Sequence, residues 1–408
     1  MRRRAALSLI VCVFLLCGCT SILETERVLV TPHEDMNLSA PAQEPTPNAS
    51  NYDELLAVTR NLLERAENSG RVNVFEYEGD LNADVTAVRD ELLFHDALGS
   101  YALSDVMLIV TPIVSFMDIQ IELSDRRSAE QIDSIINVST QRYLRMELLS
   151  MMSDYRSDAA ILTSLSGITV DEVLGYLSEL YYENPLEIAM LPITTVEVYP
   201  PEPTRNARLI ELNFDYTQSS ATLKSFSDLI KSAARDVAES ASGENDAEIL
   251  LSLCVALSEL SDYDSALGSL SEYSSQNIAA TAYGALSSGS AIGEGYAMAY
   301  KALCESLTIT CQVVLGTRDN LPYAWNIVSY DGSSYHIDPA LCDEAGMAEG
   351  FFKSDLEMSE RYVWDRANYP MCDGLLSYVD IAAPANWEEG VDDIEIDTIE
   401  VGEEPEET

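Results

Sequence analysis

The chain has 408 residues, of which 69 are acidic and 23 are lysine or arginine, so its formal net charge at pH 7 is −46. So negative a surface repels phosphate backbones and anionic lipid headgroups, which argues against nucleic acid as a partner. The length and a hydrophobic content of 47% leave room for more than one folded domain.

The N-terminus has the pattern of a secretory signal. Arg2–Arg4 form a basic segment, and Ala5–Leu16 form an apolar run that is too short to cross a bilayer. The run ends in Leu-Cys-Gly-Cys, which is similar to a bacterial lipobox and predicts Cys19 as the lipidated first residue of the mature chain. An ordinary secretory signal cut after a small residue is the alternative. We expect residues 1–19 to be a lipoprotein signal, and the protein to be extracytoplasmic and held at a bacterial membrane by lipid alone.

Composition marks the flexible parts of the chain. Residues 20–50 are rich in Thr, Pro, Ser, Asn and Glu and predict a tether. The stretch Ser240–Asp246 predicts a domain boundary. Residues 385–408 predict an acidic, solvated tail. An apolar alternation within that tail could instead form an edge strand against a partner; it consists of Ile394, Ile396, Ile399 and Val401.

A similar order of predicted elements occurs twice, which predicts two α/β modules, at residues 51–150 and 151–240. The first copy follows a helix from Tyr52 to about Asn68 and a strand over Val72–Tyr77. Its elements are the helix Leu81–His95, the strands Val106–Val110 and Ile119–Leu123, and a helix over about Ala129–Leu149. The second copy consists of the helix Ile168–Glu183, the strands Thr194–Val198 and Leu209–Tyr216, and the helix Leu223–Ala238. Internal duplication and chance agreement of secondary structure both explain this order.

The C-terminal part carries three specific motifs. The segment from Ala282 to Val313 reads AYGALSSGSAIGEGYAMAYKALCESLTITCQV, and YAWNIV from Tyr323 and YHIDP from Tyr335 follow it. These motifs closely resemble the core of bacterial transglutaminase-like domains, which are papain-related folds with a Cys–His–Asp triad. The family pattern runs A-x-C-E-G-Y, then H-A-W-N-x-V, then H-x-D-P. The resemblance implies a transglutaminase-like (papain-like) domain at residues 247–384. With the repeated order of elements before it, the expected fold is α+β, with two duplicated α/β modules followed by this domain.

Carried over residue by residue, the resemblance places Gly293 at the nucleophile position, Tyr323 at the base position and Asp338 at the third. Glycine has no side chain with which to attack a carbonyl. Tyrosine has a reference pKa of about 10 and is a poor general base near neutrality. Since losing either group removes most of a triad's rate, we expect no intact catalytic residue. We expect Asp338 to anchor a turn before Pro339 or to accept a hydrogen bond from Tyr323.

No nearby residue is placed to restore the chemistry. Cys304 lies eleven positions after Gly293, roughly 16 Å along a helix that rises 1.5 Å per residue, so we expect it to be a small buried thiol. Ser290 follows a serine-rich stretch that predicts a loop. His336 belongs to the motif beside Asp338, and we expect it to be structural.

Five cysteines follow Cys19, and they lie in the C-terminal part: Cys254, Cys304, Cys311, Cys342 and Cys372. They form no C-x-x-C pair, and the chain has no D-x-D-x-D-G loop, so we expect no metal and no cofactor. Cys342 and Cys372 are candidates for a disulfide, which their spacing does not establish.

Together these features predict a cell-surface lipoprotein. Its transglutaminase-like domain is expected to be inactive and to bind an extracellular peptide or a cell-wall polymer, or to serve structurally. One alternative is a hydrolase or protein-modifying enzyme with a non-standard active site, although nothing in residues 50–240 gathers a nucleophile, a base and an orienting group. A third reading is an assembly or adhesion protein that binds through the paired modules.

Overall fold

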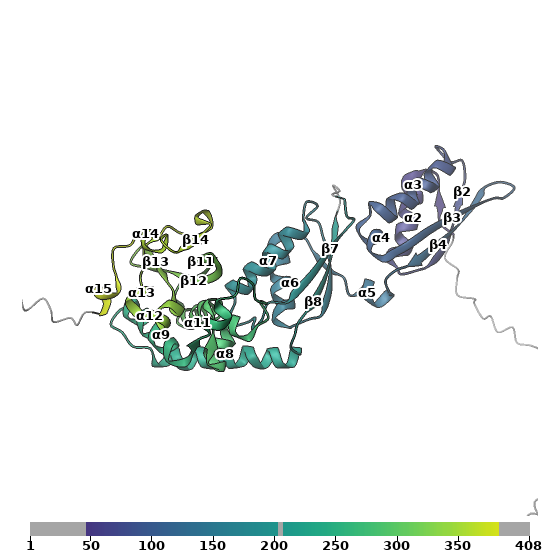
Figure 1. The fold of residues 1–408 in the computed structure, drawn as a ribbon. Helices are drawn as coiled ribbons and strands as arrows, with labels where there is room; N and C mark the ends of the chain where they lie inside the picture. Colours follow the sequence, from purple (N-terminus) through teal and green to yellow (C-terminus); the bar gives the residue numbers. More distant parts are fainter. Residues whose placement is uncertain (1–45, 203–206, 383–408) are drawn as a thin grey trace, which may run out of the picture. The chain divides into compact units, whose positions relative to one another are not determined.

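The computed structural model describes residues 46–202 and 207–382 (Figure 1). The predicted signal with Cys19, nearly all of the predicted tether, and the acidic tail with Ile394, Ile396, Ile399 and Val401 lie outside these residues. Within the two described ranges, no helix combines the length and the apolar character that a membrane span requires.

The first α/β unit is a four-stranded sheet with the strand order β1-β2-β4-β3. Ile119, Ile121 and Leu123 alternate along β4 and are buried, because every second residue of a strand faces the same side. Asn51 and Asp80 cap the two longer helices through their side chains. The elements are β1 (Asn48–Ala49), α2 (Tyr52–Glu64), β2 (Ser69–Val74), α3 (Leu81–Phe94), α4 (Ala97–Ala102), β3 (Leu103–Pro112) and β4 (Met117–Asp125).

The second α/β unit has a sheet of the same kind, with the order β5-β6-β8-β7. In each sheet the first pair of strands is parallel and the other two pairs are antiparallel. The elements are β5 (Ile136–Val138), α6 (Gln141–Ser153), β6 (Asp158–Thr163), α7 (Val170–Glu183), β7 (Ile193–Tyr199) and β8 (Arg208–Asp215).

The prediction of a single helix over about Ala129–Leu149 is wrong. A short helix, α5 (Ala129–Asp133), ends there, the strand β5 follows, and Thr140 then caps the start of α6. The three-residue strand β5 lies between two helical stretches, so the sequence pattern did not indicate it. β5 pairs in parallel with β6 and belongs to the second sheet. The second α/β unit therefore begins near Ile136, and not at residue 151 as predicted.

The C-terminal part combines helices with a sheet of order β13-β12-β11-β14. Gly316 lets β14 approach β11, because a Cβ at this position would lie 2.3 Å from the Val363 carbonyl oxygen. The main elements are α8 (Ser220–Ser240), α9 (Asp246–Leu260), β9 (Asp262–Tyr263), α10 (Ser265–Gly268), β10 (Ser290–Ala291), α11 (Gly293–Ser306), β11 (Cys311–Arg318), β12 (Leu321–Tyr330), β13 (Ser333–Ile337), α12 (Pro339–Ala345), α13 (Met347–Gly350), α14 (Asp355–Met358), β14 (Tyr362–Trp364) and α15 (Tyr378–Ala382).

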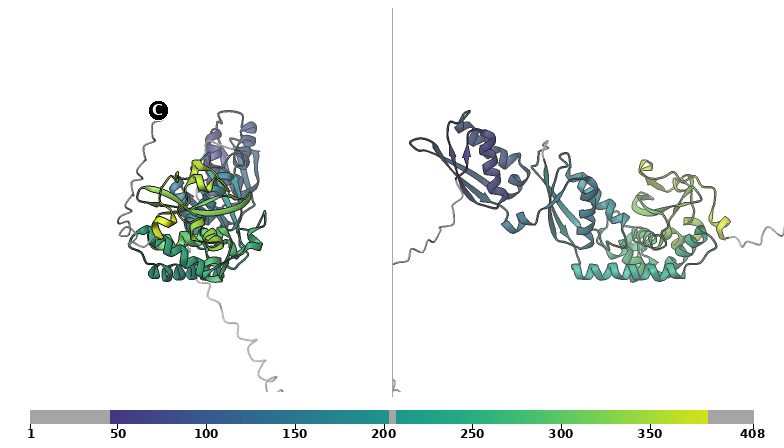
Figure 2. Two further views of the ribbon diagram at one scale, coloured as in Figure 1. Left: turned by 60° about the vertical axis from the view of Figure 1, so that its left-hand side comes forward. Right: turned by 180° about the vertical axis from the view of Figure 1, so that it is seen from behind.

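One continuous hydrophobic core joins the second α/β unit to the C-terminal part. The long helix α8 packs against α11, and the right-hand view of Figure 2 shows α8, in teal, along the lower side of the C-terminal part. Gln276 adds a polar link, because its side chain donates to the Asp215 carbonyl and accepts from the Thr217 N–H. The boundary predicted at Ser240–Asp246 is a short loop between α8 and α9, and it does not divide the core.

Two local expectations differ from the structure. The loop expected over Ser287–Ser290 instead contains the end of a π-helical turn (Gly284–Ser288) and the start of β10. Cys342 and Cys372, the candidates for a disulfide, are both free and buried, as are the other three cysteines of the C-terminal part.

Candidate functional site

Three elements bring the predicted triad positions together. Gly293 begins α11, Tyr323 lies near the start of β12, and Asp338 follows β13. β12 and β13 form the predicted hairpin, whose turn residues Asp331 and Gly332 both have positive φ. All three triad positions are buried, and Tyr323 is 8% exposed.

The ring of Tyr323 fills the space beside Gly293. A Cβ at position 293 would lie 2.5 Å from Cε2 and 2.6 Å from Cζ of Tyr323. Real Cβ atoms essentially never approach a heavy atom this closely, so a larger residue at 293 requires the tyrosine to move. The two residues are therefore complementary in shape, and the ring closes the position where the resemblance would place a nucleophile.

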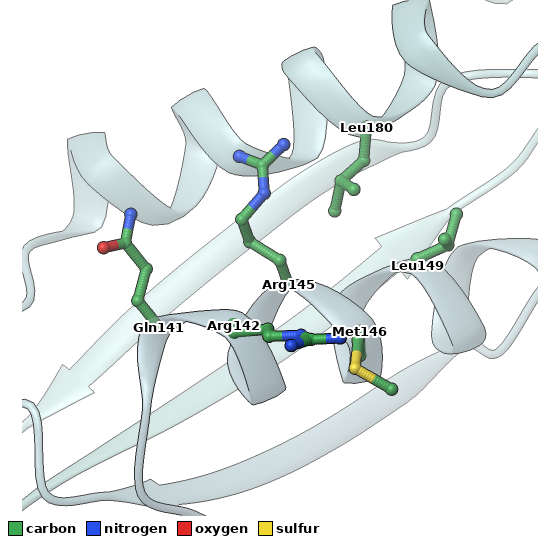
Figure 3. A pocket seen from close by; sticks show the side chains of 6 residues that line it. All are labelled: Gln141, Arg142, Arg145, Met146, Leu149 and Leu180. Carbon is green, nitrogen blue, oxygen red and sulfur yellow. The ribbon is translucent and has the colours of Figure 1, made fainter.

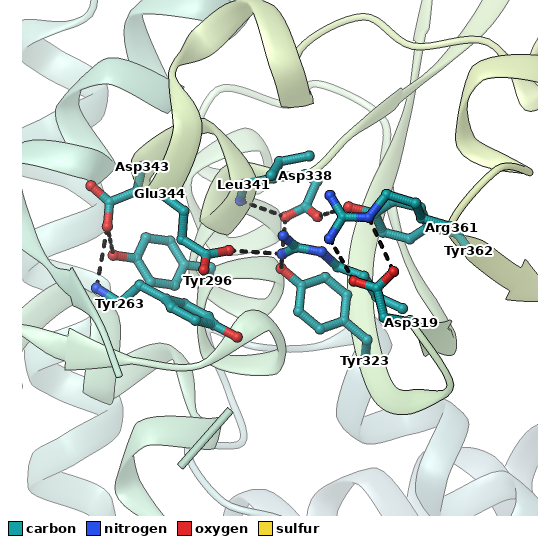
Figure 4. Close-up of polar contacts among 11 residues, drawn as sticks. Tyr263, Tyr296, Asp319, Tyr323, Asp338, Leu341, Asp343, Glu344, Arg361 and Tyr362 are labelled. Carbon is teal, nitrogen blue, oxygen red and sulfur yellow. Dashed lines mark hydrogen bonds and ion pairs between the residues drawn. The ribbon is translucent and has the colours of Figure 1, made fainter. Parts of the chain in front are cut away.

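Asp338 is fully buried and has three donors (Figure 4). Its Oδ1 accepts from the Tyr323 hydroxyl at 3.1 Å and from the Leu341 N–H at 2.9 Å, which caps α12. Its Oδ2 accepts from the Tyr362 hydroxyl at 2.5 Å. The expected hydrogen bond from Tyr323 is present, and Asp338 caps the helix that begins at Pro339 where an anchored turn before Pro339 was expected. Burial raises the pKa of Asp338, while the hydrogen bond from Tyr362 and the nearby Arg318 oppose that rise.

Arg318 engages the other side of the Tyr323 hydroxyl. Its guanidinium donates to that oxygen at 3.0 Å and to Glu344 at 2.8 Å. The guanidinium carbon also lies 5.1 Å from the centroid of the tyrosine ring. Burial and the Asp338 carboxylate raise the pKa of Tyr323 far above its usual value, so the phenol stays neutral. A neutral phenol that already donates and accepts is not placed to take a proton from a substrate.

Sequence reasoning did not identify Arg318, Tyr362 and Glu344. They come from β11, β14 and α12, so only the strand register and helix packing bring them to Asp338. Position 318 carried one weak signal, because it is a cation near the end of a largely apolar strand.

A second buried carboxylate directly follows Gly293. Glu294 Oε1 accepts from the Tyr182 hydroxyl at 2.7 Å, and Oε2 accepts from the Tyr273 hydroxyl at 2.9 Å. Burial raises the pKa of this carboxyl group. Because Tyr182 lies on α7, the contact ties the second α/β unit to the first turn of α11.

His336, Asp355 and Cys372 bring three potential metal ligands within 4.8 Å of one another. His336 Nδ1 accepts from the Trp325 indole N–H at 2.9 Å, so in the neutral ring Nε2 carries the proton and donates to Asp355, also at 2.9 Å. Neither ring nitrogen then has a lone pair for a metal or for the thiol. Burial raises the pKa of Cys372 to about 12, which keeps the thiol protonated. This donor set fits neither a metal site nor a cysteine nucleophile, and His336 has the structural contacts that the sequence led us to expect.

A separate hollow of about 450 Å³ lies between α6 and α7 (Figure 3). Arg145 lines it, but its guanidinium already pairs with Glu179 and Glu183. The other lining side chains are Gln141, Arg142, Met146, Leu149 and Leu180. The hollow gathers no catalytic set of side chains.

No protein-family model and no curated protein matches the sequence. Among solved structures, the chain is similar to one described as a crystal structure of a TGase, with 13% identity and a TM-score of 0.22 over 72% of this chain and 58% of that chain. It is also similar to a putative cysteine protease from Cytophaga hutchinsonii, with 13% identity and a TM-score of 0.22 over 37% of this chain and 66% of that chain. Both structures extend beyond the part that matches.

Proposed function

We propose that this chain is a bacterial surface lipoprotein, anchored through Cys19, whose transglutaminase-like domain is catalytically silent. It holds an extracellular peptide or a cell-wall polymer, or it serves structurally. The observation that carries the proposal is the Tyr323 ring beside Gly293, because the ring fills the place of the expected nucleophile. The sequence motifs around Gly293, Tyr323 and Asp338 support the family assignment.

The polar network supports the loss of chemistry. In a working triad the carboxylate orients a histidine. Here the Asp338 carboxylate accepts hydrogen bonds from two phenols and one backbone N–H. These three hydrogen bonds link β12, β14 and α12, so the carboxylate has a structural role.

We also propose that the two α/β units arose by internal duplication. Their sheets have equivalent strand orders, β1-β2-β4-β3 and β5-β6-β8-β7. The helix between the second and third strands of each unit starts at Leu81 and at Val170. Equivalent order and similar spacing favour a repeat over chance.

The proposal is tested by assaying the full chain for amine incorporation, deamidation and peptide hydrolysis. We expect no turnover above that of an Asp338→Asn variant whose folding is checked by circular dichroism. Turnover that survives purification and disappears in Asp338→Asn would refute the proposal that the domain is catalytically inactive. Labelling of whole cells with a palmitate analogue tests the anchor, and a Cys19→Ala variant that still carries lipid would contradict it.

A further inference from the structure

Part of strand β11 has a free edge. β12 pairs with β11 along its whole length, but on the other side β14 pairs only with Gly316–Arg318. At the end of the free stretch that lies next to β14, the Tyr369 hydroxyl accepts a hydrogen bond from the Leu315 N–H at 3.1 Å. Residues 311–315 therefore lack a strand partner on this side among the residues that the structure describes.

The bond to Tyr369 shows which peptide groups face the free edge. The N–H and C=O of one strand residue point to the same side, and the side alternates from residue to residue. Because the Leu315 N–H faces this edge, the N–H and C=O of Val313 and Cys311 face it too. Within residues 46–202 and 207–382, neither residue has a hydrogen-bond partner there. Both residues line the groove described below, so these peptide groups must bond to water or to a ligand there.

A groove of about 580 Å³ runs along this edge, within the volume range of ligand clefts. Gln312, Val313 and Leu315 form part of one wall. Ser178 and Tyr182 of α7 form part of the opposite wall, and α7 and β11 are neighbours in Figure 1. The hydrogen bond from Tyr182 to Glu294 fixes the α7 wall against the first turn of α11.

We propose that this groove binds an extended polypeptide segment of a partner protein, which pairs as an added strand with Cys311 and Val313. Addition of a strand satisfies unpaired peptide groups and lets alternate side chains enter pockets. The inference rests on the proposed function, since it names the ligand class of the binding domain.

The charges at the groove favour neutral or basic side chains in the bound segment. Glu179 and Glu183 line it with side chains that are each 59% exposed, and both pair with Arg145. Lys301 also lines the groove, but its side chain is only 16% exposed and lies 3.9 Å from Glu305, so these three carboxylates and two cations leave a local excess of negative charge. The whole chain carries a net charge of −46. An acidic segment, including the acidic end of this chain, is repelled by this surface.

The test uses the full chain and two labelled peptides, acetyl-KTVTVTK-amide and its matched counterpart acetyl-ETVTVTE-amide. We expect the lysine peptide to bind at least about tenfold more tightly by fluorescence anisotropy, a difference that salt reduces. Hydrogen–deuterium exchange is expected to slow in a fragment that covers residues 311–315 when the lysine peptide is added.

Ser178→Trp places a large ring in the groove and is expected to weaken binding at least about tenfold. Ser225→Trp is the matched control, because Ser225 is an exposed serine on α8. Gln312→Trp, at an exposed position on β11, blocks the groove independently if the first variant folds poorly.

Several results would overturn this inference. They are equal binding of the two peptides, unchanged exchange at residues 311–315, and peptide binding that Ser178→Trp and Gln312→Trp leave intact. Slowed exchange caused by soluble cell-wall fragments alone assigns the groove to a polymer instead. Faster exchange after deletion of residues 383–408 assigns it to the chain's own end. None of these results measures turnover, so none of them contradicts the proposal that the domain is catalytically inactive. Turnover, in contrast, would refute that proposal and leave the groove inference untouched.

Discussion

Tyr323 and Gly293 occupy one space that admits a single side chain. The 2.5 Å between a Cβ at 293 and Cε2 of the ring means that enlarging one residue requires shrinking the other. The two positions are therefore expected to be energetically coupled, and the first prediction concerns that coupling.

Gly293→Cys alone is expected to lower the free energy of unfolding by about 1–3 kcal/mol, the usual cost of overpacking a core. Adding Tyr323→His removes the clashing ring, so the double variant is expected to recover part of that loss. A double-mutant cycle measured by urea denaturation checks the coupling. Additive effects of the two changes would show that the ring moves away freely.

The same double variant is expected to gain reactivity toward iodoacetamide at position 293, because a helix N-terminus and a nearby imidazole favour the thiolate. The background is the wild-type chain, whose five cysteines of the C-terminal part are all buried. Labelling followed by peptide mass mapping locates the modified residue. If Gly293→Cys with Tyr323 intact reacts equally fast, the ring does not close the site.

Asp338→Ala is expected to cost about 3–5 kcal/mol, because it leaves the Tyr323 and Tyr362 hydroxyls and the Leu341 N–H without their buried acceptor. Asp319→Asn is the matched control, since Asp319 pairs with Arg361 at the surface and its side chain is 52% exposed. Its loss is expected to cost less than about 1 kcal/mol. Equal effects of the two changes would contradict the structural role of Asp338.

Stability is expected to increase as the pH falls from 7. Burial raises the pKa of Glu294 and of Asp338 in the folded state, so the folded chain binds more protons than the unfolded chain in the window above the ordinary carboxyl pKa. This contribution is complete below the unfolded pKa and is lost as the pH rises through the folded one. Glu294→Gln is expected to flatten the dependence, measured as unfolding midpoints in urea between pH 4 and 7. An unchanged slope in that variant would assign the effect to the surface charge.

The His336 cluster is expected to hold no functional metal. Dialysis against EDTA is expected to leave the thermal midpoint unchanged, because the Trp325 N–H and the Asp355 carboxylate engage both ring nitrogens. Asp355→Ala is expected to destabilise the fold with or without the chelator. Stoichiometric zinc in the purified protein, with a midpoint that EDTA lowers, would contradict this reading.

Much of the site could be predicted from the sequence, because its motifs are local. The spacing of small and apolar residues after Gly293 indicates α11, and Asp331-Gly332 indicates the hairpin that places Tyr323 near Asp338. The register of β11 with β12 and β14 brings Arg318 and Tyr362 to the same carboxylate, and no local pattern encodes it.

Short or shared elements were harder to predict. The strand β5 has three residues between two helical stretches, so helical periodicity on both sides hid it. The role of Glu294 depends on Tyr182, which is 112 positions earlier in the chain. A carboxylate at the first turn of a helix usually reflects the helix dipole, and its burial became evident only in the packed structure.

The mutual exclusion of Gly293 and Tyr323 also sets the order in which the two side chains can be exchanged. A side chain added first at position 293 meets the aromatic ring, because its Cβ would lie 2.5 Å from Cε2 of Tyr323. Any engineered route to a nucleophile at position 293 therefore has to remove the ring from position 323 before the glycine is replaced, or together with it.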